Sequence, residues 1–272
     1  MKVGILISLH TEGTIDEKFK RVKDFGLSSC QLCCWDMSQY TPEIAEEVNN
    51  ACKKYGVKIS TVWAGWSGPS EWNFYEGPIT LGLVPAPYRD TRISELKSGS
   101  DFAKLLDVEN VATHMGFLPE NPNTEEYRLT VCAIRDVAEH CKRNGQYLLF
   151  ETGQETPVTL LRTIEDIATG NLGINLDPAN LIMYGKANPV DALDVFGKYV
   201  KDVHAKDGMY PTDGRKLGKE VPLGEGKVNI KALVKRLKEV GYDGPLTIER
   251  EISGDEQNKD ILSAKTLLEQ LI

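Results

Sequence analysis

The amino-acid sequence predicts a single-domain (β/α)8 barrel that spans residues 1–272, and three observations favour this fold. Eight β-rich segments alternate with eight helical segments, which is the rhythm of a parallel α/β barrel. A chain of 272 residues with 41% hydrophobic residues is long enough for one large core. The alternative, an open doubly wound sheet, normally has a GxGxxG turn after its first strand, whereas this chain has "SLHTEGT" there. We therefore expect a TIM barrel.

The boundaries of the strands and helices follow from local signals. A charged helix end is repeatedly followed by glycine and a β-rich run, as in "KKYGVKISTVW" and "KRNGQYLLFE", which is typical of a helix closed by a left-handed glycine. The segment "TIDE" indicates a capping box, and "TPEIAEE" and "TPVTLL" place threonine at the cap with proline in the first turn. The expected strands are 2–8, 28–34, 57–63, 109–114, 147–151, 172–177, 200–204 and 245–250, and the expected helices are 15–25, 42–55, 90–106, 124–143, 157–168, 189–197, 229–240 and 258–271.

Two connections in this pattern are unusually long. They are "AGWSGPSEWNFYEGPITLGLVPAPY" after the third strand and "AKDGMYPTDGRKLGKEVPLGEGKV" after the seventh. A loop between a strand and the next helix usually has about two to six residues, and longer loops are commonly functional. We expect both loops to lie on the catalytic face of the barrel.

Composition limits the classes of function. The net charge of −8 argues against a nucleic-acid partner, because such binding normally needs a basic surface, so a small molecule is the expected ligand. The opening run "MKVGILISLH" is too short for a signal peptide, and no segment reaches the ~18 apolar residues of a membrane span. We expect a cytoplasmic protein without a membrane partner. Its oligomeric state is left open, with a homo-oligomer among the options.

The six cysteines lack the paired CxxC spacing of a zinc site. Adjacent Cys33 and Cys34 also suit no disulfide framework. We expect reduced core thiols, and a reactive Cys33 or Cys34 is the alternative.

Side chains with metal-ligating chemistry stand at the ends of the last four expected strands. Glu151 ends "LLFE" and Asp177 ends "INLD". His204 ends "KDVH" and Glu249 ends "LTIE". The carboxyl ends of barrel strands meet at one mouth, however far apart they are in the sequence. We therefore expect these four side chains to lie together.

Three carboxylates and one imidazole form a set that is typical of a divalent-metal site. Such a set suits Mn²⁺, Mg²⁺, Co²⁺ or Zn²⁺ with positions left for a substrate. Three buried carboxylates without a cation would be costly, because like charges cannot all ionise in a dry site. Any one of them could instead cap a helix or pair with a lysine, but four in succession favour one metal ion. A second ion would need further acids, for which Asp202, Asp207 and Asp213 are candidates.

Four segments of the chain resemble the sugar phosphate isomerase/epimerase family of xylose isomerase-like TIM barrels. They are "LLFETGQET", "GINLDPANL", "VHAKDG" and "VPLGEGKVNIKALVKRLKEVGYDGPLTIERE", so the C-terminal half matches closely and the N-terminal half only in its rhythm. The resemblance implies one divalent metal, most often Mn²⁺, on Glu151, Asp177, His204 and Glu249. It also implies that Glu151 and Glu249 are the catalytic acid and base.

The resemblance further implies a metal-dependent isomerase or epimerase of a ketose or keto sugar, phosphorylated or not. A metal chelated by a carbonyl and the neighbouring hydroxyl would acidify the C–H bond between them and stabilise an enediolate. One glutamate would remove the proton and the other return it. A metal-dependent lyase or dehydratase of a keto sugar or inositol is the alternative, since it shares the first step. An apurinic endonuclease would need more histidines and a basic groove.

Other residues near the strand ends are expected to bind the substrate. Asn180 stands where ketose 3-epimerases of the family usually have histidine, which puts a close match to those enzymes in doubt and leaves room for oxidised or phosphorylated sugars. Tryptophans of the second and third loops could stack on a sugar. Arg215 could meet a phosphate, although we favour a solvated charge. The expected substrate-binding residues are His114, Glu155, Asn180, Lys206, Asp207, Trp35 and Trp66, with a structural hydrogen bond, salt bridge or packing role as the alternative for each.

Overall fold

The eight expected strands close into one parallel ring in the computed structural model, which describes residues 1–272. The order around the ring is β1-β10-β7-β6-β5-β4-β3-β2, so the predicted (β/α)8 TIM barrel is confirmed. Two further strands pair antiparallel within the loop after β7. The barrel strands are β1 Lys2–Ser8, β2 Ser29–Cys34, β3 Lys58–Ala64, β4 Asn110–Thr113, β5 Tyr147–Glu151, β6 Leu172–Leu176, β7 Val200–Ala205 and β10 Pro245–Ile248, and the loop strands are β8 Asp207–Gly208 and β9 Glu220–Val221.

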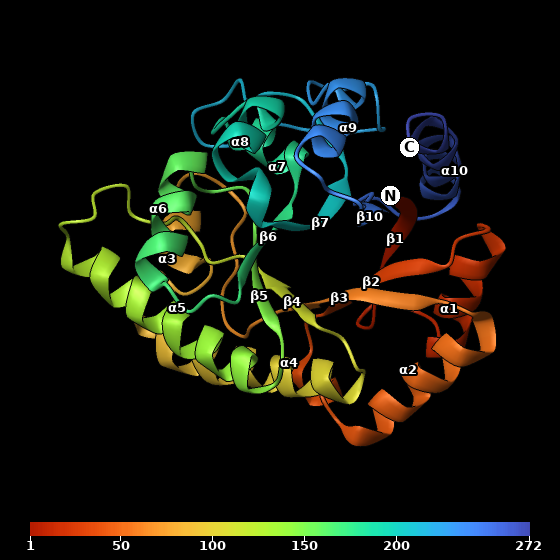
Figure 1. The fold of residues 1–272 in the computed structure, drawn as a ribbon, viewed down its shortest axis with the longest axis horizontal. Coiled ribbons are helices and arrows are strands. Elements are labelled where there is room, and N and C mark those ends of the chain that lie inside the picture. Colours follow the sequence, from red (N-terminus) through yellow and green to blue (C-terminus); the bar gives the residue numbers. More distant parts are fainter.

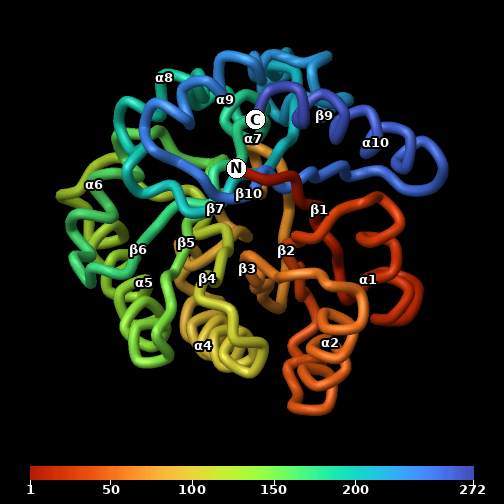
Figure 2. Tube along the Cα trace, turned by 45° about the vertical axis from the view of Figure 1, so that its right-hand side comes forward, coloured from red at the N-terminus to blue at the C-terminus, as the bar shows by residue number.

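The helices surround the ring of strands on its outside (Figure 1). The chain runs around the barrel in order, and the last helix, α10, packs against the first strand, so the two termini lie close together (Figures 1 and 2). None of the helices combines the length and hydrophobicity that a membrane-spanning segment needs. They are α1 Ile15–Asp24, α2 Pro42–Tyr55, α3 Gly77–Thr80, α4 Arg89–Leu105, α5 Glu125–Arg143, α6 Pro157–Ile167, α7 Pro178–Met183, α8 Pro189–Phe196, α9 Ile230–Glu239 and α10 Asp255–Glu269.

The helix starts agree with the capping signals in the sequence. Thr14 forms a capping box with Glu17, and Thr41 and Thr156 cap α2 and α6 ahead of a proline. The structure adds two helices that were not expected, the short α3 in the loop after β3 and α7 directly after β6. Asp177 lies at the start of α7, where one carboxylate oxygen accepts a hydrogen bond from the backbone N–H three residues later, at 2.8 Å. A residue at the mouth of the barrel therefore also fixes the local backbone.

The barrel interior is more polar than the β-rich segments suggest. Asp202 on β7 is fully buried and accepts hydrogen bonds from Thr61 of β3 at 2.7 Å and Thr247 of β10 at 3.3 Å. Burial raises the pKa of this carboxyl above its ordinary value. Because Asp202 precedes His204 by two residues on the same strand face, it lies one layer deeper in the barrel. The carboxylate of Asp202 is thus hydrogen-bonded inside the barrel. It is not available for a second metal ion at the mouth.

One buried arginine fixes the long loop between β3 and α4. The guanidinium of Arg92, in α4, donates to the backbone carbonyls of Thr80 at 2.6 Å and Gly82 at 2.7 Å. It also donates to the carbonyls of Pro69 at 2.8 Å and Ser67 at 3.3 Å. Burial lowers the pKa of Arg92 to about 10, so the side chain stays charged at neutral pH. A loop that would otherwise leave carbonyl groups unsatisfied is thereby ordered around one cation.

Replacing Arg92 should therefore destabilise the protein strongly. We expect Arg92→Met to lower the free energy of unfolding by roughly 2–4 kcal/mol, because it leaves buried carbonyl groups without donors. Urea unfolding followed by circular dichroism measures this change. The exposed Arg143, changed to Met, is the matched control and should change stability by less than about 0.5 kcal/mol. Equal stability of the two variants would show that the loop does not depend on Arg92.

Candidate active site

Four side chains from the ends of barrel strands meet at one point. Glu151 is the last residue of β5, Asp177 follows β6, His204 lies on β7 and Glu249 follows β10. One ligand atom from each lies within 4.8 Å of all the others. Three of the side chains are buried, and that of Glu249 is 14% exposed. The structure thus brings together the four residues that the sequence selected.

The ligand atoms of this cluster face one another. Nδ1 of His204 lies 3.0 Å from Oε2 of Glu249 and 3.5 Å from both Oε1 of Glu151 and Oδ2 of Asp177. Two of these atoms, Nδ1 of His204 and Oδ2 of Asp177, are buried and have only ion-pair contacts, without a hydrogen bond. Buried polar atoms without partners are costly, and a cation between them would satisfy both. The residues therefore fit a divalent metal ion.

The imidazole of His204 is oriented from within the barrel. Its Nε2 lies 2.8 Å from Oε1 of Gln31 on β2. The amide nitrogen of Gln31 donates in turn to Asn175 on β6 at 3.0 Å. The amide nitrogen of Asn175 also lies 3.1 Å from Nε2, so two amide side chains hold the ring with Nδ1 facing the carboxylates. Partners of this kind commonly orient metal-binding histidines. Gln31 and Asn175 lie mid-strand and far apart in the sequence, so no motif pointed to them.

The charges of the cluster decide its protonation. Burial acts to lower the pKa of His204, but the carboxylates of Glu249 and Glu151 outweigh it and raise this pKa well above its ordinary value. Burial acts to raise the pKa of Glu249, but Lys206 and His204 outweigh it and lower this pKa below its ordinary value. Without a metal, the carboxylates thus attract a proton onto the imidazole. A bound cation would displace that proton, since a ligating histidine is neutral.

Lys206 lies beside the cluster. Its buried ammonium is 2.7 Å from Glu251, 3.0 Å from Glu249 and 3.3 Å from Asp177. Burial acts to lower the pKa of Lys206, but the three carboxylates raise it well above its ordinary value. Lys206 therefore contacts two of the four candidate ligands as a permanent cation. Glu251, which the sequence analysis did not select, lines the cavity at this edge of the cluster.

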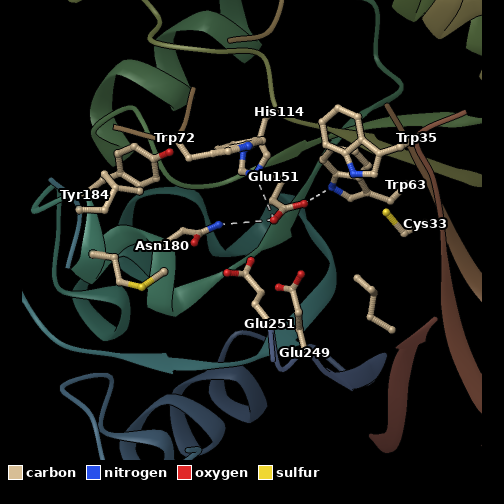
Figure 3. Close-up of a pocket in the computed structure, with 13 residues that line it drawn as sticks. Cys33, Trp35, Trp63, Trp72, His114, Glu151, Asn180, Tyr184, Glu249 and Glu251 are labelled. Atoms are coloured by element: carbon tan, nitrogen blue, oxygen red, sulfur yellow. Dashed lines mark hydrogen bonds and ion pairs between the residues drawn. The ribbon is translucent and has the colours of Figure 1, made fainter. Parts of the chain in front are cut away.

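Glu151 is contacted from three sides (Figure 3). The indole N–H of Trp63 donates to Oε2, while Nε2 of His114 lies 3.2 Å and Nδ2 of Asn180 3.4 Å from Oε1. Burial acts to raise the pKa of Glu151, but His114 and His204 outweigh it and lower this pKa below its ordinary value. The side chain is thus a fixed, ionised carboxylate. His114 and Asn180 lie at the mouth, as expected. Trp63 was expected only as one of the tryptophans that could stack on a sugar, and its hydrogen bond to Glu151 was not foreseen.

The cluster lies at the bottom of a cavity of about 340 Å³, and tryptophan side chains form one side of this cavity. Trp35, Trp63 and Trp72 line this cavity. Trp66, which was expected to do so, is 3% exposed and packs behind the wall, with its ring centre 5.1 Å from that of Trp35. The expectation for Trp66 was wrong because the loop turns it inward. The other lining residues are Leu6, Cys33, His114, Glu151, Asn180, Met183, Tyr184, Leu217, Glu249 and Glu251.

Asp207 does not face this cavity, which corrects the expectation that it binds substrate. One of its oxygens accepts hydrogen bonds from the backbone N–H groups of Gly208 at 2.8 Å and Val228 at 3.0 Å. The other accepts from Gly224 and Gly226, each at 3.0 Å. The chain bends directly after β7, so this carboxylate turns back to fix the long loop between β7 and α9. Both oxygens are occupied, and the residue is 1% exposed.

Glu155 also lies outside the cavity wall, buried near His114. Burial raises the pKa of Glu155 to about 7, although the charge of His114 opposes this rise. Its Oε1 has no hydrogen-bond partner. Burial acts to lower the pKa of His114, and Glu151, followed by Glu155, raises it above its ordinary value. The expected direct contact of Glu155 with a sugar is therefore not supported by its position, and its visible effect is on His114.

The two long loops contact each other beside the cavity. The backbone N–H of Phe74 donates to the carbonyl of Arg215 at 3.1 Å, and the Arg215 guanidinium lies 5.7 Å from the ring centre of Tyr75. Arg215 thus joins the loops.

The cysteines are free, and burial raises the thiol pKa values of Cys33 and Cys34, which disfavours a reactive thiolate.

Comparison with known proteins agrees with this architecture. Residues 19–271 match the family model of the xylose isomerase-like TIM barrel, so the chain belongs to that family. A solved structure of a xylose isomerase domain protein from Planctomyces limnophilus is 36% identical, with a TM-score of 0.93 over 99% of this chain and 96% of that one. An uncharacterised protein of Methanocaldococcus jannaschii, MJ1311, is 23% identical over 100% of this chain and 89% of its own length.

More distant structures share the fold. The 3-keto-D-glucoside 4-epimerase YcjR of E. coli is 17% identical, with a TM-score of 0.74 over 99% of both chains. Structures of similar fold include a D-tagatose 3-epimerase-like protein, a probable dehydratase and a family member in complex with magnesium. Proteins named as sugar epimerases thus share the fold of this chain.

The raised pKa of Glu155 predicts a pH dependence of stability in metal-free protein. The folded state binds the proton up to about pH 7, whereas the usual value is 4.5, so stability should fall as the pH rises between these values. Glu155→Gln removes this loss and should be more stable than the native protein by roughly 1–3 kcal/mol at pH 8, and by much less at pH 5. Urea unfolding at the two pH values, with a chelator present, measures the difference.

The matched control is Glu139→Gln, which alters an exposed carboxylate and should give the same small difference at both pH values. A Glu155→Gln variant whose stability difference from the native protein does not change with pH would contradict the raised pKa.

Proposed function

We propose that this protein is a divalent-metal-dependent sugar isomerase or epimerase that acts on a ketose or keto sugar through an enediolate intermediate. One observation carries the proposal. Glu151 and Glu249 come from strands that two other strands separate in the ring, yet both belong to the four-ligand cluster and line the same cavity. Two carboxylates on different sides of a bound sugar are what a proton transfer between its faces requires. The sugar epimerases of similar fold support this assignment.

We propose that Glu151, Asp177, His204 and Glu249 hold one metal ion per chain, with Mn²⁺ as the first candidate and Mg²⁺, Co²⁺ and Zn²⁺ as others. The ion would polarise the carbonyl and neighbouring hydroxyl oxygens of the sugar and stabilise the negative charge of the enediolate. Mixed oxygen and nitrogen ligands suit any of these metals. Residues 1–272 are proposed to act as one catalytic domain.

The two glutamates would move the protons. His204 and Lys206 contact only Oε2 of Glu249, so Oε1 remains free to accept a proton from the sugar. Glu151 is fixed by Trp63 and His114 and stays ionised, as a base must. Return of the proton to the opposite face of the same carbon gives an epimer. Return to the neighbouring carbon gives an isomer.

The remaining cavity residues would orient the sugar. Asn180 and His114 can hydrogen-bond hydroxyl groups near Glu151, and Trp35 can stack on an apolar face of the ring. Lys206, the cation nearest the cluster, is already paired with three carboxylates. This pairing supports an uncharged sugar rather than a phosphorylated one as substrate.

A lyase or dehydratase of a keto sugar or inositol is the second candidate, because a probable dehydratase has a similar fold and the first proton removal is shared. Incubation with ketoses and 3-keto sugars in deuterium oxide separates the two. An epimerase returns a sugar in which deuterium has replaced one hydrogen. A dehydratase releases water and leaves an unsaturated product.

Metal content gives the first test. The purified protein should bind about one divalent ion per chain, measured by inductively coupled plasma mass spectrometry. His204→Ala should lose most of this ion, because it removes the central ligand atom. His140→Ala, which alters a surface histidine paired with Asp101 at 2.7 Å, should keep it. Full activity of the protein after complete removal of metal would refute the proposal.

Replacement of each glutamate gives the second test. Glu151→Gln and Glu249→Gln keep the size and one coordinating oxygen but remove the proton acceptor, so turnover should fall by about 10²-fold or more. Substrate affinity should change less. With substrate deuterated at the exchanging carbon, one variant should still wash out the label from one epimer without converting it. Near-normal conversion by both variants would show that the two residues are structural and not the catalytic acid and base.

A further inference from the structure

A second cavity opens beside the one that holds the four-ligand cluster. Its volume is about 920 Å³, compared with about 340 Å³ for the first. We call it the distal groove, and its walls are the loop 8–13 after β1 and the loop 249–253 after β10. The two cavities are adjacent, because they share the lining residues Leu6, Cys33, Trp35, Glu249 and Glu251. Small-molecule sites usually measure about 300–1,000 Å³, so the first cavity is near the lower limit of that range.

The position of the shared residues shows where a ligand would pass between the cavities. Trp35 and Cys33 lie at one end of the first cavity and Tyr184 at the other (Figure 3). Glu249 and Glu251, both from the segment after β10, point into the cavity (Figure 3). A sugar that occupies the cluster would therefore direct one end past Trp35 and Glu251 into the distal groove.

The charges of the distal groove favour an uncharged ligand. Arg250 is paired with Glu220 at 2.7 Å and with Asp260 at 2.8 Å. Nη2 of Arg21 donates to the side chains of Gln257 at 2.7 Å and Asn258 at 2.8 Å. Two carboxylates thus neutralise Arg250, whereas Arg21 is held by neutral amide groups.

The remaining basic groups of the groove are also unsuited to an anion. The ammonium of Lys18 donates to the backbone carbonyls of Leu9 at 3.2 Å and Thr11 at 2.5 Å. Burial, followed by the charge of Lys18, lowers the pKa of His10 below its ordinary value, which favours the neutral imidazole. Glu12 and Glu251 add negative charge to the same walls. The four carboxylates that line the groove outnumber its three cations, which disfavours a phosphate, whereas hydroxyl groups would find acceptors.

Trp35 provides a flat surface at the junction. Its ring is held by Trp63, with ring centres 4.9 Å apart, and by Trp66 and Trp72, with edge contacts at 5.1 Å and 6.4 Å. A tryptophan fixed on several sides loses little conformational freedom when a ligand stacks on it. Stacking on indole is a common way to bind the apolar face of a sugar ring, so both cavities offer a sugar-binding surface.

We propose that the distal groove binds a second, non-reacting unit, so that the substrate is a neutral glycoside of a keto sugar rather than a free monosaccharide. This inference rests on the proposed function for the identity of the reacting unit as a sugar. The second unit lies beyond Trp35 and Glu251 and takes no part in the chemistry. Contacts with remote parts of a substrate can position its reacting end.

The test compares one-ring with two-ring ligands that cannot react. Methyl glucoside, methyl maltoside and methyl cellobioside are titrated into the Mn²⁺-loaded protein in a calorimeter. At least one two-ring glycoside should bind about tenfold or more tightly than methyl glucoside. Glucose 6-phosphate should bind no more tightly than glucose. Equal affinity for one and two rings, or a clear preference for the phosphate, would overturn the proposal.

Variants locate the binding of the second ring. Ser253→Trp fills the distal groove from the loop after β10, and Thr11→Trp fills it from the loop after β1. Both should abolish the advantage of two rings while leaving the affinity for methyl glucoside unchanged, and Ser253→Ala, the matched control, should keep the advantage. Thermal unfolding establishes that the variants are folded. An undiminished advantage in both folded tryptophan variants would place the second ring elsewhere and refute the assignment of the groove.

These ligands lack a keto group, so their binding does not depend on turnover. Absence of deuterium exchange with every keto sugar, together with a retained preference for two rings, would refute the proposed function alone. Exchange with free monosaccharides but no preference for two rings would refute the groove proposal alone.

Discussion

Three carboxylates around Nδ1 of His204, two of them buried, form the constraint on which the site depends. Negative charges so close together cannot remain buried unless positive charge is placed among them. In the protein without metal, Lys206 and the imidazole proton supply this charge. Gln31 then fixes the ring so that the same nitrogen can serve a proton or a metal ion. The arrangement suits a metal cation whose charge the carboxylates neutralise and which a ligand in the cavity can reach.

Two buried charged side chains act on the backbone of the long loops. Arg92 satisfies carbonyl groups of the loop after β3, and Asp207 satisfies N–H groups of the loop after β7. Both loops are long and would otherwise contain unpaired buried groups. Their order matters for the site because they carry Trp72 and Leu217, which line the cavity. The interior pair of Asp202 and Thr61 likewise supports the barrel below the cluster.

The electrostatics of the two cavities point in the same direction. Cations near the mouth and along the distal groove are paired with carboxylates or backbone carbonyls, and several acidic groups remain. A ligand that brings hydroxyl groups and a flat apolar face suits such a surface better than an anion does. Trp35 stands where both cavities meet and is fixed by its aromatic neighbours. The same residue would therefore contact the reacting unit and whatever is attached to it.

The sequence by itself determined the barrel and the four cluster residues, because alternating strands and helices require a parallel ring, and strand ends in such a ring converge. That reasoning reached Glu151 and Glu249 without any motif for a substrate. Only the tertiary structure decided which neighbours face inward. Trp66 and Asp207 turned out to support loops, while Trp63 and Glu251 line the cavity. The reason is physical: periodicity specifies a residue's strand and side, but loop direction and contacts between distant strands, such as Gln31 with His204, arise only when the ring closes.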